Sequence, residues 1–110
     1  MATSYKVLAQ SNPSATTETT LYTTTSGSSG IVSTIAVCNQ ASSAATYRIA
    51  IRPAADGTTA AKHWIVYGAT VPASDSVMLT VGITMAAGDK IQIYASSANR
   101  SFSAFGSEIA

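Results

Sequence analysis

Hydrophobic and polar residues alternate with a period of two in several stretches of the chain. The clearest case is TYRIAIR at residues 46–52. Its side chains divide between two faces, with apolar Tyr47, Ile49 and Ile51 on one and charged Arg48 and Arg52 on the other. Because successive side chains of a β-strand point to opposite faces, this pattern predicts a strand with one buried face. The same alternation runs through residues 76–81 and 90–96.

Further segments complete a predicted set of about eight short strands. They are rich in Val, Ile, Thr and aromatic residues and lie between turn signals such as Asn12-Pro13 and Asp56-Gly57. These segments are residues 5–10, 20–24, 31–38, 62–67 and 101–105. The segment IVSTIAVC has apolar residues on both faces, which predicts a central strand, whereas YKVLAQ is expected at a sheet edge.

Short strands at this spacing predict an all-β fold, an antiparallel β-sandwich of immunoglobulin-like or jelly-roll-like type. A small barrel is the second architecture that the pattern allows. A length of 110 residues fits one domain over residues 1–110. The predicted core consists of inward-facing residues from the alternating segments, namely Val37, Tyr47, Ile49, Ile51, Val77, Leu79, Ile91 and Ile93.

Charge is sparse along the chain. Only 10% of the residues are charged and the formal net charge is +1, against about 25% charged residues in a typical soluble domain. The sequence has no basic patch for nucleic acid and no apolar run of the ~20 residues that span a membrane. The opening MATSYKVLAQ lacks the apolar core of a signal peptide, so synthesis in a cytoplasm is expected. Low charge indicates either a surface covered by neighbouring subunits or one kept soluble by Ser and Thr hydroxyls.

Residues that perform chemistry are few. The sequence has a single histidine, His63, and a single cysteine, Cys38, which are too few for a zinc site. A catalytic triad would need His63, but no G-x-S-x-G elbow occurs, and we expect His63 in a strand at a surface or interface. Asp56, Asp75 and Asp89 lie at turns, where aspartate commonly accepts backbone hydrogen bonds. We therefore predict no enzymatic activity, no catalytic or metal-binding residues and no cofactor.

Aromatic residues suggest either a ligand platform or an interface. Trp64 and Tyr67 would form a platform for a sugar or a base, but their opposite parity in a regular strand predicts opposite faces. A core or interface position is therefore expected for Trp64. The candidate interface residues are two arginines and three aromatic residues: Arg48, Arg52, Trp64, Phe102 and Phe105. The segment 102–110 is expected to reach a neighbouring chain, so that deleting residues 101–110 weakens assembly more than folding.

Three strings show a family resemblance: SYKVLAQSNPSATTETTLY, CNQASSAATYRIAIRPA and IQIYASSANRSFSAFGSEIA. From Ser4 to Ala110, the sequence resembles small virion proteins of tailed bacteriophages, notably phages of cyanobacteria and other aquatic bacteria. The shared motifs are architectural and include no active-site signature. The resemblance implies a virion structural protein, made in the host cytoplasm, that binds copies of itself and other virion proteins.

Three hypotheses for function follow. The first is an oligomeric adaptor, a trimer or a ring, in the tail, fibre, baseplate or neck apparatus. The second is a capsid decoration (cement) protein that clamps neighbouring shell subunits. The third is a β-sandwich that binds a glycan of the host surface. Nucleic acid and membranes are not expected as partners.

Overall fold

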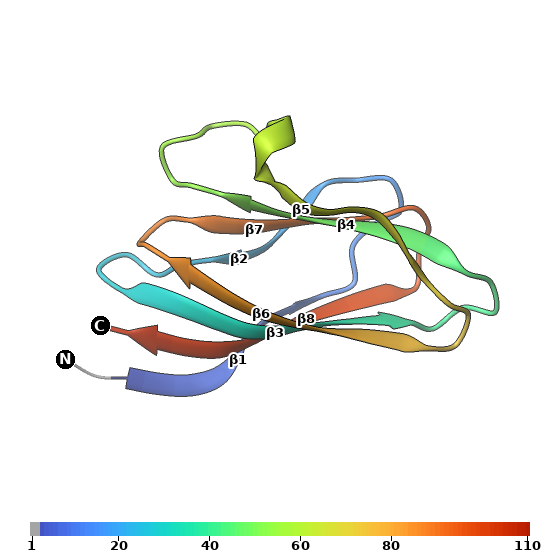
Figure 1. Cartoon of the computed structure of the whole chain (residues 1–110), viewed down its shortest axis with the longest axis horizontal. Helices are drawn as coiled ribbons and strands as arrows, with labels where there is room; N and C mark the ends of the chain where they lie inside the picture. The colour runs from blue at the N-terminus through green and yellow to red at the C-terminus, as the bar shows by residue number, and fades with distance from the viewer. Residues whose placement is uncertain (1–2) are drawn as a thin grey trace.

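Two four-stranded antiparallel sheets pack face to face and form the two layers seen in Figure 1. This computed structural model describes residues 3–110, so residues 1 and 2 of the predicted domain lie outside the described range. The elements are β1 Thr3–Ser11, β2 Thr19–Thr23, β3 Ser29–Asn39, β4 Ala45–Arg52, the 3-10 helix η1 Ala61–His63, β5 Trp64–Val71, β6 Ser76–Met85, β7 Lys90–Ala95 and β8 Arg100–Ile109. The predicted antiparallel β-sandwich of about eight strands is confirmed.

The strand order shows which kind of sandwich this is. Sheet A has the order β1-β8-β3-β6 and sheet B the order β2-β7-β4-β5. The first strand therefore pairs with the last, the second with the seventh, the third with the sixth and the fourth with the fifth. This is a long antiparallel hairpin wrapped around the core, which is the arrangement of a jelly roll. Of the two sandwich types that the sequence predicted, the structure has the jelly roll.

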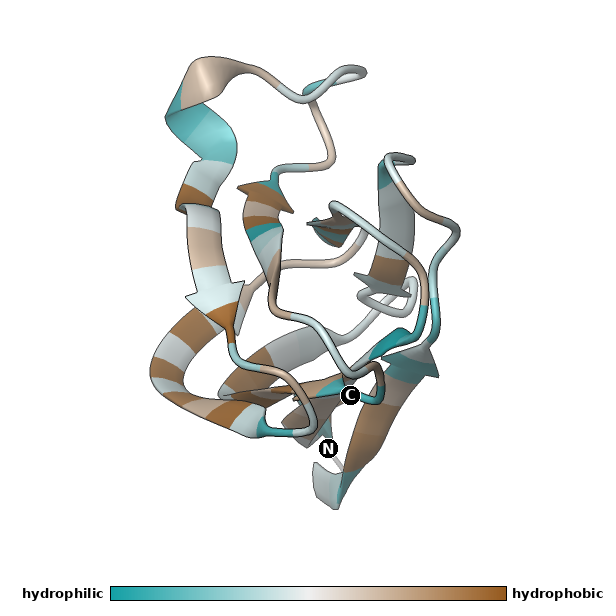
Figure 2. Ribbon diagram, turned by 90° about the vertical axis from the view of Figure 1, so that its right-hand side faces the viewer, coloured by the Kyte–Doolittle hydropathy of each residue, from teal (hydrophilic) through white to brown (hydrophobic). Residues whose placement is uncertain are grey.

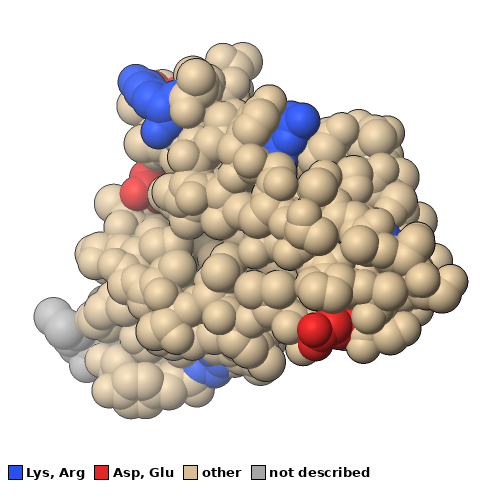
Figure 3. Space-filling model, turned by 45° about the vertical axis from the view of Figure 1, so that its right-hand side comes forward, with Lys and Arg blue, Asp and Glu red and all other residues tan. Residues whose placement is uncertain are grey.

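The core lies between the two sheets and follows the period-two pattern. Figure 2 shows hydrophobic and polar bands alternating along the strands. Five of the predicted core residues are buried: Val37, Tyr47, Ile49, Ile91 and Ile93. The other three are partly buried against this cluster: Ile51, Val77 and Leu79. The face drawn in Figure 3 is mostly uncharged, with only a few Lys, Arg, Asp and Glu side chains on it. Within residues 3–110, no helix is long and apolar enough to cross a membrane.

Strand β8 differs most from its prediction. It extends to Ile109 and lies between β1 and β3, hydrogen-bonded to both. Phe102 is fully buried, and its ring contacts that of Tyr47 edge to face at a centroid distance of 6.3 Å. Residues 102–109 are therefore part of a central strand of sheet A and do not form a free terminal segment. Phe102 is a core residue and leaves the set of candidate interface residues.

One end of the sandwich is held together by the carboxylate of Glu108 in β8. It accepts hydrogen bonds from the hydroxyls of Tyr22 and Thr25, and its other oxygen lies 3.0 Å from the Lys6 Nζ. Tyr22 belongs to sheet B, whereas Lys6 and Glu108 belong to sheet A. The Tyr22 hydrogen bond, followed by those of Lys6 and Thr25, lowers the pKa of Glu108 to about 2. Glu108 thus links the two sheets as an ionised group.

Replacing Glu108 by Gln should destabilise the protein by about 1.5–3 kcal/mol at pH 7, the usual value of hydrogen bonds to a charged group. The folded-state pKa of about 2 lies below the ordinary value of 4.5. The contribution is therefore complete above pH 4.5 and is lost as the pH falls towards 2. Urea unfolding at a series of pH values should show the difference between the two proteins shrinking over this range. The control is Asp75→Asn, which changes an exposed turn carboxylate; a Glu108→Gln deficit that stayed constant to pH 2.5 would contradict the prediction.

The opposite end of the sandwich is held by two buried polar side chains, Asn39 and Arg100. The Asn39 Nδ2 donates to the carbonyls of Ser43, Val71 and Pro72, and its Oδ1 accepts from the Ala41 amide. The Arg100 guanidinium donates to the carbonyls of Ala98 and Ser43. These bonds join three loops at this end and satisfy backbone carbonyls, including that of the fully buried Val71.

Candidate functional site

The structure brings two of the candidate residues, Arg48 and Trp64, together on the outer face of sheet B. The Arg48 guanidinium lies over the ring of Tyr67 at 4.2 Å, over that of Tyr94 at 4.3 Å and near that of Trp64 at 5.9 Å. Trp64 and Tyr67 also contact each other edge to face, with ring centroids 5.5 Å apart. We call Arg48, Trp64, Tyr67 and Tyr94 the aromatic cluster.

The shared face of Trp64 and Tyr67 overturns the parity argument, because β5 is not a regular strand. Trp64 pairs with Ala50 and Val66 with Ile49, so Ile65 is an extra residue in the ladder. A bulge of this kind shifts the alternation by one residue. Val66 is packed against the core, while Tyr67 is 63% exposed. Trp64 and Tyr67 therefore both lie on the outside of sheet B.

Arg48 is held by stacking and not by an ion pair. Within residues 3–110, ion-paired carboxylates belong to Glu108 and Asp56, which bind other cations. The hydrogen bonds that arginines donate in this part of the chain come from Arg52 and Arg100. A cation on aromatic faces is stabilised by the negative face of each ring. The N–H groups at the edge of the Arg48 guanidinium remain available to another acceptor.

An open hollow of about 470 Å³ adjoins the aromatic cluster. Two segments line the hollow. One is β5, with the rings of Trp64 and Tyr67, and the other is the segment Thr59, Ala60 and Ala61 that leads into η1. In Figure 1 this segment lies in the long connection that stands above sheet B. The hollow therefore combines aromatic surface with one hydroxyl and lies next to a cation.

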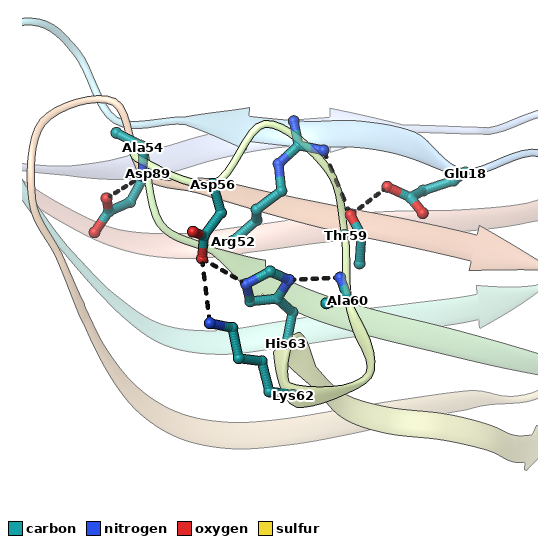
Figure 4. Close-up of polar contacts among 9 residues, drawn as sticks. All are labelled: Glu18, Arg52, Ala54, Asp56, Thr59, Ala60, Lys62, His63 and Asp89. Carbon is teal, nitrogen blue, oxygen red and sulfur yellow. Dashed lines mark hydrogen bonds and ion pairs between the residues drawn. The ribbon is translucent and has the colours of Figure 1, made fainter.

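A polar chain behind the hollow fixes the position of Thr59 (Figure 4). The Thr59 hydroxyl donates to the Glu18 carboxylate at 2.6 Å and accepts from the Arg52 guanidinium at 3.4 Å. Glu18 also accepts from the Gln92 amide at 2.7 Å. Partial burial raises the pKa of Glu18, but the hydrogen bonds from Gln92 and Thr59 outweigh this and leave the pKa below its ordinary value. The candidate interface residue Arg52 thus serves within the chain to position the connection.

His63 is buried in η1 and not exposed in a strand, which corrects the expectation for this residue. Its Nδ1 accepts a hydrogen bond from the Ala60 amide at 2.8 Å, so Nε2 carries the proton and lies 2.9 Å from the Asp56 Oδ2 (Figure 4). The His63 hydrogen bond lowers the pKa of Asp56. With both ring nitrogens in use, His63 has no free nitrogen to take a proton from a serine. It closes the loop that forms one wall of the hollow.

The remaining aspartates act in turns, as predicted. Asp89 accepts from the amides of Ala54 and Ala86, and Asp75 accepts from the amide of Ser76. In the described part of the chain, no three His, Cys, Asp or Glu side chains lie together in a way that would hold a metal ion.

Phe105 lies on the opposite side of the molecule, on the outer face of sheet A. It lines a second, apolar hollow of about 500 Å³ together with Tyr5, Val7 and Ile31. Tyr5 is 85% exposed and Val7 is 49% exposed, both on the edge strand β1. We call Tyr5, Val7, Ile31 and Phe105 the apolar patch. The predicted interface set is therefore divided between two faces and the core.

Sequence reasoning did not identify Tyr94 or Thr59. In β7, Ile91, Ile93 and Ala95 point inward, so the same alternation could have placed Tyr94 on the outer face. The sequence could not predict which residue lies opposite Tyr94, because its pairing with Arg48 joins strands far apart in the chain. Thr59 had no signal at all, since it lies in an irregular loop.

The fold defines the molecule as a jelly-roll β-sandwich, with the aromatic cluster on one outer face and the apolar patch on the other. Protein-family models and curated proteins give no match to the sequence. Among solved structures, the chain is similar to a chain in the structure of infectious bursal disease virus, Gx strain, with a TM-score of 0.60 and 15% identity, covering 97% of this chain and 32% of that one. A chain in the structure of the Gt strain is similar with a TM-score of 0.54 and 14% identity, at the same coverage. The protein thus spans about a third of those chains, and the likeness concerns the fold.

Proposed function

We propose that this protein is a structural, non-catalytic part of a virion, an oligomeric adaptor of a tailed bacteriophage in the tail, fibre, baseplate or neck apparatus. The observation that supports it most is the jelly-roll topology, which is common in viral particles and is shared with chains in the structure of a virus. The sequence resemblance to small phage virion proteins agrees with it. Sparse charge over a face such as that in Figure 3 suits a surface that other subunits cover.

The surface that we assign to self-association is the apolar patch. It places two exposed side chains of β1, Tyr5 and Val7, beside Ile31 and Phe105 in one hollow. Monomeric soluble proteins seldom leave such groups together in water, so the patch is the better candidate for contact with a second copy. Strand β1 is also one of the two edge strands of sheet A, so its backbone groups can take part in the contact.

Copy number in purified particles tests the place in the virion. Quantitative mass spectrometry should find the chain in the particle, at the few copies of a tail, fibre, baseplate or neck ring. A number of copies that matches the shell lattice would favour the capsid decoration role instead. Complete absence of the chain from particles would refute the virion proposal.

Replacing Val7 by Glu should weaken self-association by about tenfold or more, because a carboxylate would be buried at an apolar contact without a partner. Ile65→Glu is the matched control, since Val7 and Ile65 are both 49% exposed and Ile65 lies on sheet B. Sedimentation velocity over a concentration series measures the effect for both variants. Equal weakening by both substitutions, or a wild-type protein that stays monomeric at high concentration, would refute the assignment of the apolar patch.

A further inference from the structure

The hollow beside the aromatic cluster has the features of a ligand site. Trp64 is half-buried and Tyr67 is 63% exposed, so their rings present surface to solvent while β5 and the η1 segment hold them. The volume of about 470 Å³ lies within the range of small-ligand sites. Aromatic rings take up the apolar C–H face of a pyranose, and a nearby hydroxyl such as that of Thr59 matches the hydroxyls at the rim of the sugar ring.

Arg48 indicates the charge of that ligand. Its guanidinium is stacked between Tyr67 and Tyr94, with no carboxylate of residues 3–110 paired to it. Stacking occupies the faces of the guanidinium and leaves its N–H edge free, and that edge matches a carboxylate in a bidentate manner. The Glu18 carboxylate, which lies behind the hollow, is hydrogen-bonded to Gln92 and Thr59 and not to Arg48.

We propose that this hollow binds an acidic sugar, a pyranose that carries a carboxylate. The sugar ring packs on Trp64 and Tyr67 and its carboxylate pairs with Arg48. The Thr59 oxygen, whose proton is donated to Glu18, accepts a hydrogen bond from a sugar hydroxyl through its remaining lone pair. The proposal depends on sheet B and the η1 segment alone. It therefore does not require that the chain assembles through the apolar patch or that it belongs to a virion.

Trp64 is the sole tryptophan of the chain and lines the hollow, so its fluorescence reports on occupancy directly. The full-length protein should show a saturable change in Trp64 emission on titration with a galacturonic acid trisaccharide. The neutral galactose trisaccharide should bind at least about tenfold more weakly, because it lacks the group that pairs with Arg48.

Two substitutions test the role of Arg48. Arg48→Gln should weaken binding of the acidic trisaccharide by about tenfold or more, and Arg48→Lys, which keeps the charge but loses the planar fork, should weaken it by less. Lys62→Gln is the matched control, since it removes an equally positive, exposed side chain of the η1 segment that does not line the hollow. If Arg48→Gln does not fold, as judged by circular dichroism, the comparison of Arg48→Lys with the wild type tests the role of Arg48.

Several results would overturn the proposal. They are an unchanged Trp64 emission with the acidic trisaccharide, equal binding of the neutral one, or equal loss on Lys62→Gln and Arg48→Gln. A further one is a Trp64 response to a hexaglutamate peptide in the absence of a response to the acidic trisaccharide. That last result would show that the hollow receives an acidic protein segment and not a sugar.

Discussion

Deletion of residues 101–110 should leave the chain unfolded. Strand β8 lies between β1 and β3, so its loss removes the partner to which β1 is hydrogen-bonded and leaves β3 with an unpaired side. It also removes Phe102 and Ala104 from the core. Truncating one buried phenylalanine to alanine costs about 3–5 kcal/mol, and a domain is stable by only about 5–15 kcal/mol. Loss of a central strand exceeds that margin.

Far-UV circular dichroism and limited proteolysis of residues 1–100 measure the result. We expect no β-type spectrum, no cooperative thermal transition and rapid digestion. A chain that lacks only Ala110, which is exposed and follows β8, is the control and should fold normally. A 1–100 fragment with a cooperative transition would contradict the prediction and would support the expectation from the sequence that the deletion weakens assembly more than folding.

The C-terminal segment shows which parts of this fold the hydrophobic pattern can predict and which it cannot. The alternation in β4, β6 and β7 predicted which side chains of these strands face the core, because period two depends on local backbone geometry alone. Phe102 and Phe105 differ by three positions, and one of them had to face inward in any regular strand. The sequence predicted this strand only as far as residue 105, and the next residue, Gly106, belongs to a type that is depleted in strands. Pairing with β1 and β3 outweighs that propensity.

The candidate site was less predictable for a related reason. Trp64 and Tyr67 share a face because Ile65 is bulged, and whether a bulge forms depends on how β5 pairs with β4. The sequence pattern does not indicate the register in which β5 pairs with β4. Similarly, Asp56 and His63 meet because the loop folds back on itself before η1. Arg48 was correctly predicted as an outward residue of its strand, but its contact with Tyr94 needs the β4–β7 pairing. Tertiary pairing, not composition, therefore builds this site.

Replacing Gly106 by Ala should destabilise the protein by about 3 kcal/mol or more, a large effect for one methyl group. A Cβ at this position would lie 1.9 Å from the carbonyl oxygen of Ile31, 2.9 Å from its carbonyl carbon and 3.0 Å from the Cα of Val32. All three are backbone atoms of β3, so no rotamer change relieves the contact. Strand β8 cannot shift away easily, because β1 holds its other side.

The register explains why the strands approach so closely here. Val32 pairs with Gly106 and Thr34 with Phe105, so Ser33 is an extra residue of β3 at this point. The Ser33 hydroxyl donates to the Phe105 carbonyl at 3.1 Å and closes the irregular step. Glycine lets the bulged strand lie against β8 without a side chain between the two backbones. An alanine would force the ladder apart next to the apolar patch.

Urea unfolding of Gly106→Ala against Gly82→Ala tests this account. Gly82 lies in β6 of the same sheet, and a Cβ there would meet no atom within 4 Å. Since glycine within a strand is entropically unfavourable, Gly82→Ala should be neutral or stabilising by up to about 1 kcal/mol. A Gly106→Ala variant as stable as Gly82→Ala would mean that β3 and β8 separate at little cost. The close packing of these central strands would then not be what requires glycine at this position.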